Sequence, residues 1–271
     1  MGSRGPAAPG PAGGGFIRWV ELDSEAADPS TYPFTLPVVS WLAQYGRLVL
    51  DPAVTLLTGD NGTGKSTLIE ALAVAAGFNP EGGGKSFRFT TRSTESDLGT
   101  HLRLTWAPRK PKTGFFLRAE SFYNLATEVE NLEREDPGLI ASSYGGISPH
   151  ERSHGESFLA LAVHRFGPRG LYVLDEPEAA LSVPGALALL ARMHDLVATG
   201  SQFILATHSP ILLAYPGATI YQISDTGTLQ VVDYDQADTV RLYRDFLSDP
   251  GRFLHHLFSD PEPPPSPHQR G

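Results

Sequence analysis

Short, fully apolar runs alternate along this chain with longer segments whose apolar residues recur every three or four positions. The apolar runs are residues 54–58, 171–174 and 203–206. Such runs are typical of strands buried on both faces of a parallel sheet. The amphipathic segments, 65–78, 156–166 and 186–198, have the spacing of helices that pack on a sheet. This alternation predicts an α/β fold with a mostly parallel core sheet flanked by helices.

The remaining segments predict a less regular surround. Residues 16–22 resemble a first strand, 219–223 and 229–232 a hairpin, and 239–258 a helix interrupted at Pro250-Gly251. Residues 38–50 mix apolar and polar side chains without a clear period. Short apolar segments at 87–89, 102–104 and 115–117 predict a small antiparallel β subdomain within 79–118. Residues 121–134 are expected to be helical and 137–149 to form a loop.

Both ends of the chain have compositions that do not support a packed core. Residues 1–15 are nearly all Gly, Pro and Ala, and residues 259–271 are rich in proline. We expect both to be disordered tails. The prediction is therefore a single domain over residues 16–258, with 79–118 as an antiparallel β insertion.

A glycine-rich loop follows the first apolar run. It matches the pattern G-x-x-x-x-G-K-[ST] and lies between a predicted strand and a predicted helix, which is the context that a P-loop NTPase requires. Backbone N–H groups of the loop and the helix start would bind phosphate, Lys65 would reach the β- and γ-phosphates, and the Ser66 hydroxyl would bind Mg²⁺. The predicted nucleotide-binding residues are Gly59, Asn61, Gly62, Thr63, Gly64, Lys65, Ser66 and Thr67.

Two acids and a histidine follow the next two apolar runs. Asp175 and Glu176 come directly after 171–174, at the strand end where ligands gather in α/β sheets. Asp175 is placed to hold Mg²⁺, and Glu176 to polarise a water for attack on the γ-phosphate. His208 follows the run 203–206. It is either a structural hydrogen-bonding residue or a donor that senses the γ-phosphate.

A second anion site is predicted at Ser153-His154-Gly155-Glu156-Ser157, where a serine and an exposed glycine backbone precede a helix. One nucleotide does not need two such sites in one chain. Two chains do, if each presents this segment to the phosphate held by the other.

Composition narrows the class of protein. The net charge of -9 argues against coating of nucleic acid through bulk charge, and the lack of cysteine excludes a disulfide framework, a thiolate zinc site and a cysteine nucleophile. No run is long enough to span a membrane and no signal-peptide core is present, so we expect a cytoplasmic protein. Residues 85–118 hold eight Lys or Arg against two acids. They form either a phosphate-binding strip or a solvated strand face.

Together these motifs resemble the ATP-binding cassette (ABC) ATPase superfamily over about residues 16–225. Residues 59–67 match its Walker A, 153–157 its signature, 171–176 its Walker B, 180–182 its D-loop and His208 its switch histidine. The resemblance implies a homodimer that sandwiches two ATP and Mg²⁺, with Ser153, Gly155 and Glu156 of one copy completing the site of the other. In such a site Glu176, His208 and Lys65 are the catalytic residues.

The chain also departs from the family pattern. His154 and Glu156 replace the usual glycine and the glutamine of transporters, and Ser209-Pro210 follows the histidine where transporters commonly have aspartate. These features are more similar to the soluble chromosome-maintenance and recombination-repair branch, and to small stand-alone bacterial ATPases. Only about 85 residues separate Walker A from the signature, without the heptads of a coiled-coil arm. For the Q-loop, Glu120 is either a metal ligand or a helix-capping acid.

Three functions use such a site. The first is a soluble ATPase switch whose closure is sensed by a protein or nucleic-acid partner, and it is the function that we favour. The second is the motor subunit of a membrane transporter. The third, a phosphotransferase, would have no use for the signature segment.

Overall fold

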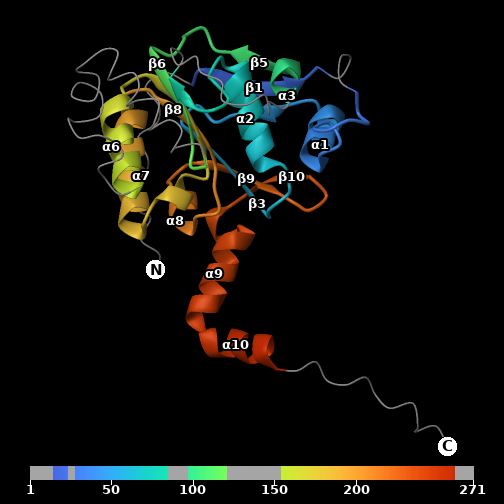
Figure 1. The fold of residues 1–271 in the computed structure, drawn as a ribbon, viewed down its shortest axis with the longest axis vertical. Coiled ribbons are helices and arrows are strands. Elements are labelled where there is room, and N and C mark those ends of the chain that lie inside the picture. The colour runs from blue at the N-terminus through green and yellow to red at the C-terminus, as the bar shows by residue number, and fades with distance from the viewer. Residues whose placement is uncertain (1–14, 24–27, 85–96, 121–153, 260–271) are drawn as a thin grey trace, which may run out of the picture.

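A seven-stranded sheet forms the centre of the part of the chain that the computed structural model describes, residues 15–23, 28–84, 97–120 and 154–259 (Figure 1). Its strand order is β10-β9-β3-β8-β7-β6-β4. The strands from β9 to β6 are parallel to their neighbours, and the two outer strands are antiparallel. The strand bounds are β3 Val54–Gly59, β4 Gly83–Gly84, β6 Thr113–Arg118, β7 Gly170–Asp175, β8 Gln202–Ala206, β9 Thr219–Ile223 and β10 Leu229–Val232. The predicted α/β fold class is confirmed.

Alternation along the buried strands supplies a core on each face of this sheet. In β3, Val54 and Leu56 enter one apolar cluster, whereas Leu57 enters the other. The first cluster is covered by α6 (His154–Arg165), α7 (Val183–Ala198) and α8 (Pro210–Leu213). The second is covered by α1 (Pro37–Tyr45) and α2 (Lys65–Ala75). Helices therefore flank both faces, as continuous apolar strands require.

A three-stranded antiparallel sheet completes the second face. It has the order β2-β1-β5, formed by β1 (Ile17–Leu22), β2 (Leu48–Val49) and β5 (Leu102–Trp106), with α3 (Leu98–His101) before β5. The buried Gln202 amide joins it to the central sheet. Its Oε1 accepts from the N–H groups of Phe16 and Ile17 at 2.8 and 2.9 Å, and its Nε2 donates to the Ile17 carbonyl at 2.9 Å.

One strand assignment from the sequence is wrong. Residues 115–117 were expected in the antiparallel subdomain, but β6 pairs parallel with β7 in the central sheet. Its residues Phe115, Phe116 and Leu117 are all buried, so β6 has the two-sided burial of a central strand. The antiparallel sheet is instead built from β1, β2 and β5. The undecided residues 38–50 contain α1 and β2, and the expected strand 87–89 and helix 121–134 lie outside the described residues.

The C-terminal part confirms the interrupted helix. After the 3₁₀ turn η3 (Tyr234–Gln236), helix α9 spans Asp238–Ser248 and α10 spans Pro250–Phe258. Figure 1 shows α9 running away from the central sheet, with α10 turning across its far end. Within the described ranges, none of the helices combines the length and the apolar character needed to cross a bilayer.

Candidate functional site

The glycine-rich loop joins β3 to α2, in the strand–loop–helix context that the sequence predicts. Gly64, the residue before α2, has a left-handed backbone with φ of 93°. A Cβ placed there would lie 2.7 Å from Val38 Cγ1, so a larger residue would be strained and would also clash. Asn61 and Gly62 are exposed at the tip of the loop, and the Thr63 hydroxyl donates to the Asp60 carbonyl at 2.8 Å. The loop is thus held in one shape with its tip open to solvent.

Lys65, the first residue of α2, folds back over this loop. Its Nζ donates to the carbonyls of Gly59 at 2.8 Å and Asp60 at 2.7 Å, and the residue is buried. Burial lowers the pKa of the Lys65 ammonium, while the carboxylates of Glu176 and Asp175 act in the opposite direction. An ammonium has three N–H donors, so these two bonds leave one for an anion in the loop.

Asp175 ends β7 as a buried carboxylate. Its Oδ2 lies 3.5 Å from Arg118 Nε, and its Oδ1 has no hydrogen-bond partner among the described residues. Burial raises the pKa of Asp175 to about 6, although Arg118 and a hydrogen bond from the Ser66 hydroxyl both lower it. A buried carboxylate oxygen without a partner, next to a hydroxyl on α2, is an oxygen donor set that fits Mg²⁺.

Glu176 follows with an unusual backbone. Its φ of 47° and ψ of 51° lie in the left-handed region, where a residue with a side chain is uncommon. Its N–H donates to the Ala206 carbonyl at the end of β8, at 3.0 Å. Its Oε1 lies 3.4 Å from Nε2 of His208, which follows β8. The structure therefore brings Glu176 and His208 together, because β7 and β8 are paired in parallel and end at the same edge.

Glu178 is a contributor that sequence reasoning missed. It lies in the 3₁₀ turn η2 (Pro177–Ala180), and its Oε1 accepts from the backbone N–H groups of His208 and Ser209, the latter at 3.1 Å. One carboxylate oxygen thus fixes the backbone that presents His208. The sequence held no specific signal for this role beyond an acid three residues after Asp175.

Arg118, at the end of β6, was also missed as a site residue. Its guanidinium contacts Asp175, and it donates to Glu70 Oε2 on α2 at 2.8 Å. Glu120 was expected here as either a metal ligand or a helix-capping acid. The side chain of Glu120 is 87% exposed, and its Oε2 lies 3.6 Å from Arg118 Nη2. Arg118 rather than Glu120 therefore lies beside Asp175, and the role of Glu120 stays a prediction.

The signature segment lies on another part of the chain. Gly155 and Glu156 are in the first turn of α6, which packs on the opposite face of the sheet from α2. They line a hollow of about 450 Å³ together with Ala180, Leu181 and Ser182. A Cβ on Gly155 would lie 3.0 Å from the Ala180 carbonyl, so glycine allows the close approach. Ser153 lies outside the described residues.

Comparison with known proteins gives the family. Residues 40–120 match the family "AAA domain", and residues 129–214 match "AAA domain, putative AbiEii toxin, Type IV TA system". The cytochrome c biogenesis ATP-binding export protein CcmA of Salmonella typhi is 30% identical over 176 residues, which are 63% of this chain and 82% of that protein. The chain belongs to the ABC ATPase superfamily. Its members hydrolyse ATP, and this chain is accordingly an ATP-binding ATPase.

Two further proteins are similar to this chain. CcmA 2 of Salmonella typhimurium has the same identity and coverage as the S. typhi protein. A solved nucleotide-free ATP-binding cassette from an ABC transporter is similar with a TM-score of 0.47 and 16% identity, covering 90% of this chain and all of that chain. At that level the structural likeness says nothing about function, and family membership rests on the sequence relatives.

Proposed function

We propose that this ABC ATPase is a cytoplasmic, ATP-driven conformational switch. Two copies would close face to face around two ATP and Mg²⁺, and a partner protein would sense the closure. The observation that supports this proposal best is the convergence of Lys65, Asp175, Glu176 and His208. Lys65 begins α2 after the loop that follows β3, and the other three residues lie at the ends of β7 and β8, the next strands in the sheet.

Each residue has a distinct role in this proposal. Lys65 and the amides of residues 59–67 would bind the phosphates, and Thr67 lies in the first turn of the same helix. Ser66 and Asp175 would hold Mg²⁺, which neutralises phosphate charge when it is bound. Ser153, Gly155 and Glu156 of the second copy would contact the nucleotide from the other side. Direct membrane insertion forms no part of the proposal.

Glu176 and His208 would carry out the hydrolytic step. Glu176 accepts a proton from a water whose oxygen attacks the γ-phosphorus, and the bond from that phosphorus to the β,γ-bridging oxygen breaks to leave ADP. His208 donates a hydrogen bond toward the γ-phosphate. The 3.4 Å separation of Glu176 Oε1 and His208 Nε2 supports a shared location for these two roles.

A transporter motor is the second candidate, because the relatives include proteins named as ATP-binding export proteins. Ser209-Pro210 after His208 favours the switch, since the Ser209 hydroxyl accepts from the Leu212 N–H and so caps α8 where a transporter would commonly have aspartate. Co-purification of the chain with a membrane-spanning protein in a stoichiometric complex would favour the transporter motor.

The test is the variant Glu176→Gln. It should lower ATP turnover by roughly 10²–10⁴-fold and accumulate an ATP-bound dimer. Sedimentation with and without ATP measures the dimer. Adding Ser153→Arg should leave ATP binding intact and abolish closure. Normal turnover of Glu176→Gln would show that the base is assigned wrongly, and closure despite Ser153→Arg would remove the two-chain site.

The closed variant also tests what the switch contacts. Capture of proteins by Glu176→Gln, compared with and without ATP, should identify a partner that prefers the closed state. A nucleic-acid partner would show an ATP-stimulated affinity that falls with salt. Its expected binding strip, residues 85–118, lies partly outside the described residues.

A further inference from the structure

The C-terminal arm, residues 238–258, exposes apolar side chains that no other described part of the chain covers. On α10, Leu254 is 40% exposed, Leu257 71% and Phe258 78%. Their spacing of three and four residues places them on one face of the helix. A contiguous apolar face of this kind on a protein in water indicates a contact surface.

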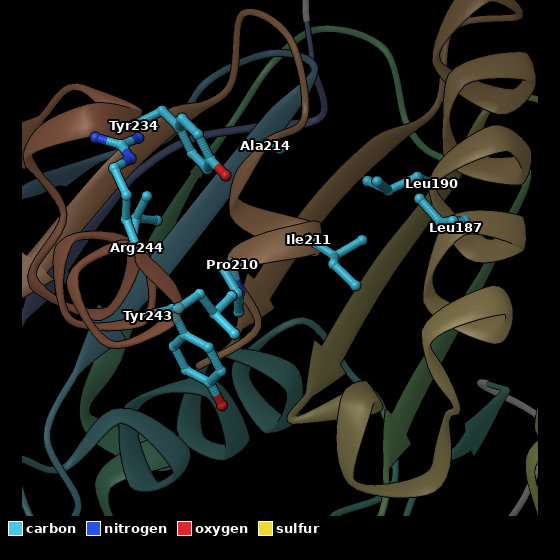
Figure 2. Close-up of a pocket in the computed structure, with 10 residues that line it drawn as sticks. Leu187, Leu190, Pro210, Ile211, Ala214, Tyr234, Tyr243 and Arg244 are labelled. Carbon is cyan, nitrogen blue, oxygen red and sulfur yellow. The ribbon is translucent and has the colours of Figure 1, made fainter. Parts of the chain in front are cut away.

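A groove of complementary character lies where the arm leaves the body (Figure 2). It has a volume of about 410 Å³ and is lined by α7, α8, η3 and α9, with Leu187, Ile211 and Tyr243 among its residues. Among the described residues that line it, Arg244 is the one with a charged side chain. Figure 2 shows Ile211, Leu187 and Leu190 facing a common space from α8 and α7. The groove therefore suits an apolar helix face.

The corner between α9 and α10 directs α10 away from this groove. Pro250 cannot continue α9, and the Asp249 carboxylate caps α10 by accepting from the Arg252 N–H at 3.1 Å. The rings of Phe246 and Phe253 meet edge-to-face at 5.7 Å and hold the two helices together. Figure 1 shows α10 beyond the end of α9, away from the body.

The charge of the arm does not oppose pairing with a second copy of this chain. The whole chain has a net charge of -9, so two copies repel each other on average. The arm is neutral, because its three acids are balanced by its three arginines, Asp238, Asp245 and Asp249 against Arg241, Arg244 and Arg252. The arm therefore adds no net charge repulsion when two copies meet through it, and each copy supplies both an apolar helix face and an apolar groove.

We propose that the arm joins two copies of this chain without nucleotide. Leu254, Leu257 and Phe258 of each copy insert into the groove of the other, next to its Ile211 and Leu187. Such an exchange is reciprocal, so it gives a closed, two-fold symmetric dimer. This contact is separate from the nucleotide site. It would keep two ATPase bodies together between rounds of closure.

Cysteine cross-linking tests this pairing directly, because the native chain has no cysteine. Leu257→Cys and Ile211→Cys proteins are mixed without ATP and treated with a short bifunctional maleimide. A covalent dimer should form in the mixture and not from either protein alone. His256→Cys, on another face of α10, is the matched control and should cross-link poorly to Ile211→Cys. Efficient cross-linking of Leu257→Cys to itself, or none in the mixture, would overturn the proposal.

Sedimentation supplies a second measurement that does not depend on cysteine. Without nucleotide the native chain should be dimeric at micromolar concentration, and Leu257→Asp should be monomeric. ATP binding by Leu257→Asp shows that the variant is folded. A native monomer, or a Leu257→Asp dimer, would contradict the arm exchange.

The two dimer contacts can be separated. Ser153→Arg should leave the nucleotide-free dimer unchanged, since the arm is intact. Leu257→Asp combined with Glu176→Gln should still dimerise when ATP is added. Failure of only one contact would identify which of the two proposals is wrong.

Discussion

The sheet edge where Lys65, Asp175 and Glu176 lie, called the edge below, and the C-terminal arm both place side chains in unusual surroundings. They do so in opposite ways. At the edge, Lys65 and Asp175 are charged groups that the fold buries. On the arm, Leu257 and Phe258 are apolar groups that the fold exposes. Burying a charge and exposing a large apolar side chain are both unfavourable for an isolated chain. Each arrangement becomes favourable when something binds: phosphate and metal at the edge, an apolar surface at the arm.

The comparison also separates two kinds of residue. Edge residues are held by several contacts, as when Arg118 joins Glu70 to Asp175 and Glu178 holds the backbone of His208. Arm residues past Val240 depend on few contacts with the body. Substitutions at the edge should therefore change chemistry strongly, whereas substitutions on the arm should change association and little else.

Among the variants that contrast the edge with the arm, the largest effect is expected from the loss of the buried cation. Lys65→Met removes the ammonium that bonds to Gly59 and Asp60 and leaves no charge for the phosphates, so ATP turnover should fall by about 10²–10³-fold. Steady-state phosphate release measures it. The matched control is Arg244→Met on the arm, which should stay within about two-fold of the native rate. Equal losses of ATP turnover in both variants would contradict the proposed difference between the edge and the arm.

Glu178 allows a finer test within the edge. Glu178→Ala leaves the N–H groups of His208 and Ser209 without their acceptor, so kcat should fall by about 10-fold while KM for ATP changes little. Glu178→Gln keeps an oxygen in the same place and should restore most of kcat. Initial rates over a range of ATP concentrations separate the two parameters. If the Gln variant were as slow as the Ala variant, the role of Glu178 as a positioning residue would be wrong.

Sequence alone was sufficient where one local pattern decides the outcome. The loop from Gly59 to Lys65, the acids after β7 and His208 after β8 are placed by strand ends, and strands this apolar have few alternatives. The strand β6 was misassigned because a short apolar run does not encode its partner, and pairing with β7 depends on contacts distant in sequence.

The missed site residues have a related cause. Once β6 is known to lie beside β7, Arg118 must end next to Asp175, and Glu120 lies beyond the strand. Glu178 bonds across 30 residues to the backbone of His208, and no spacing rule predicts such a bond. The ATPase family could be identified from motifs, whereas the side chains that support the motifs required coordinates.

A smaller effect is expected from the buried acid in the absence of nucleotide. The folded pKa of Asp175 is about 6, above its ordinary 3.8, so between these values the folded state binds more protons and stability falls as pH rises. Asp175→Asn has no such dependence. At pH 7.5 it should therefore be more stable than the native chain by about 1–3 kcal/mol, although inactive. Thermal unfolding from pH 4.5 to 7.5 measures the difference.

The exposed acid Asp245 on α9 provides the control for this pH test, because Asp245→Asn should unfold in parallel with the native chain at every pH. If native and Asp175→Asn proteins kept a constant difference across the range, burial of Asp175 would not be the source of the effect. A stabilised but inactive Asp175→Asn protein would show that Asp175 lowers the stability of the native chain and is needed for its activity.

The smallest effect is expected on the arm. Leu257 is 71% exposed, so Leu257→Ser removes little buried area and should change the unfolding free energy of the monomer by no more than about 0.5 kcal/mol. Urea unfolding of the monomeric form, at the lowest usable protein concentration, measures it. At higher concentration the native midpoint should rise while that of Leu257→Ser stays constant, because only the native arm gains from association. A midpoint independent of concentration in both proteins would mean that the exposed face of α10 is not covered by a second copy.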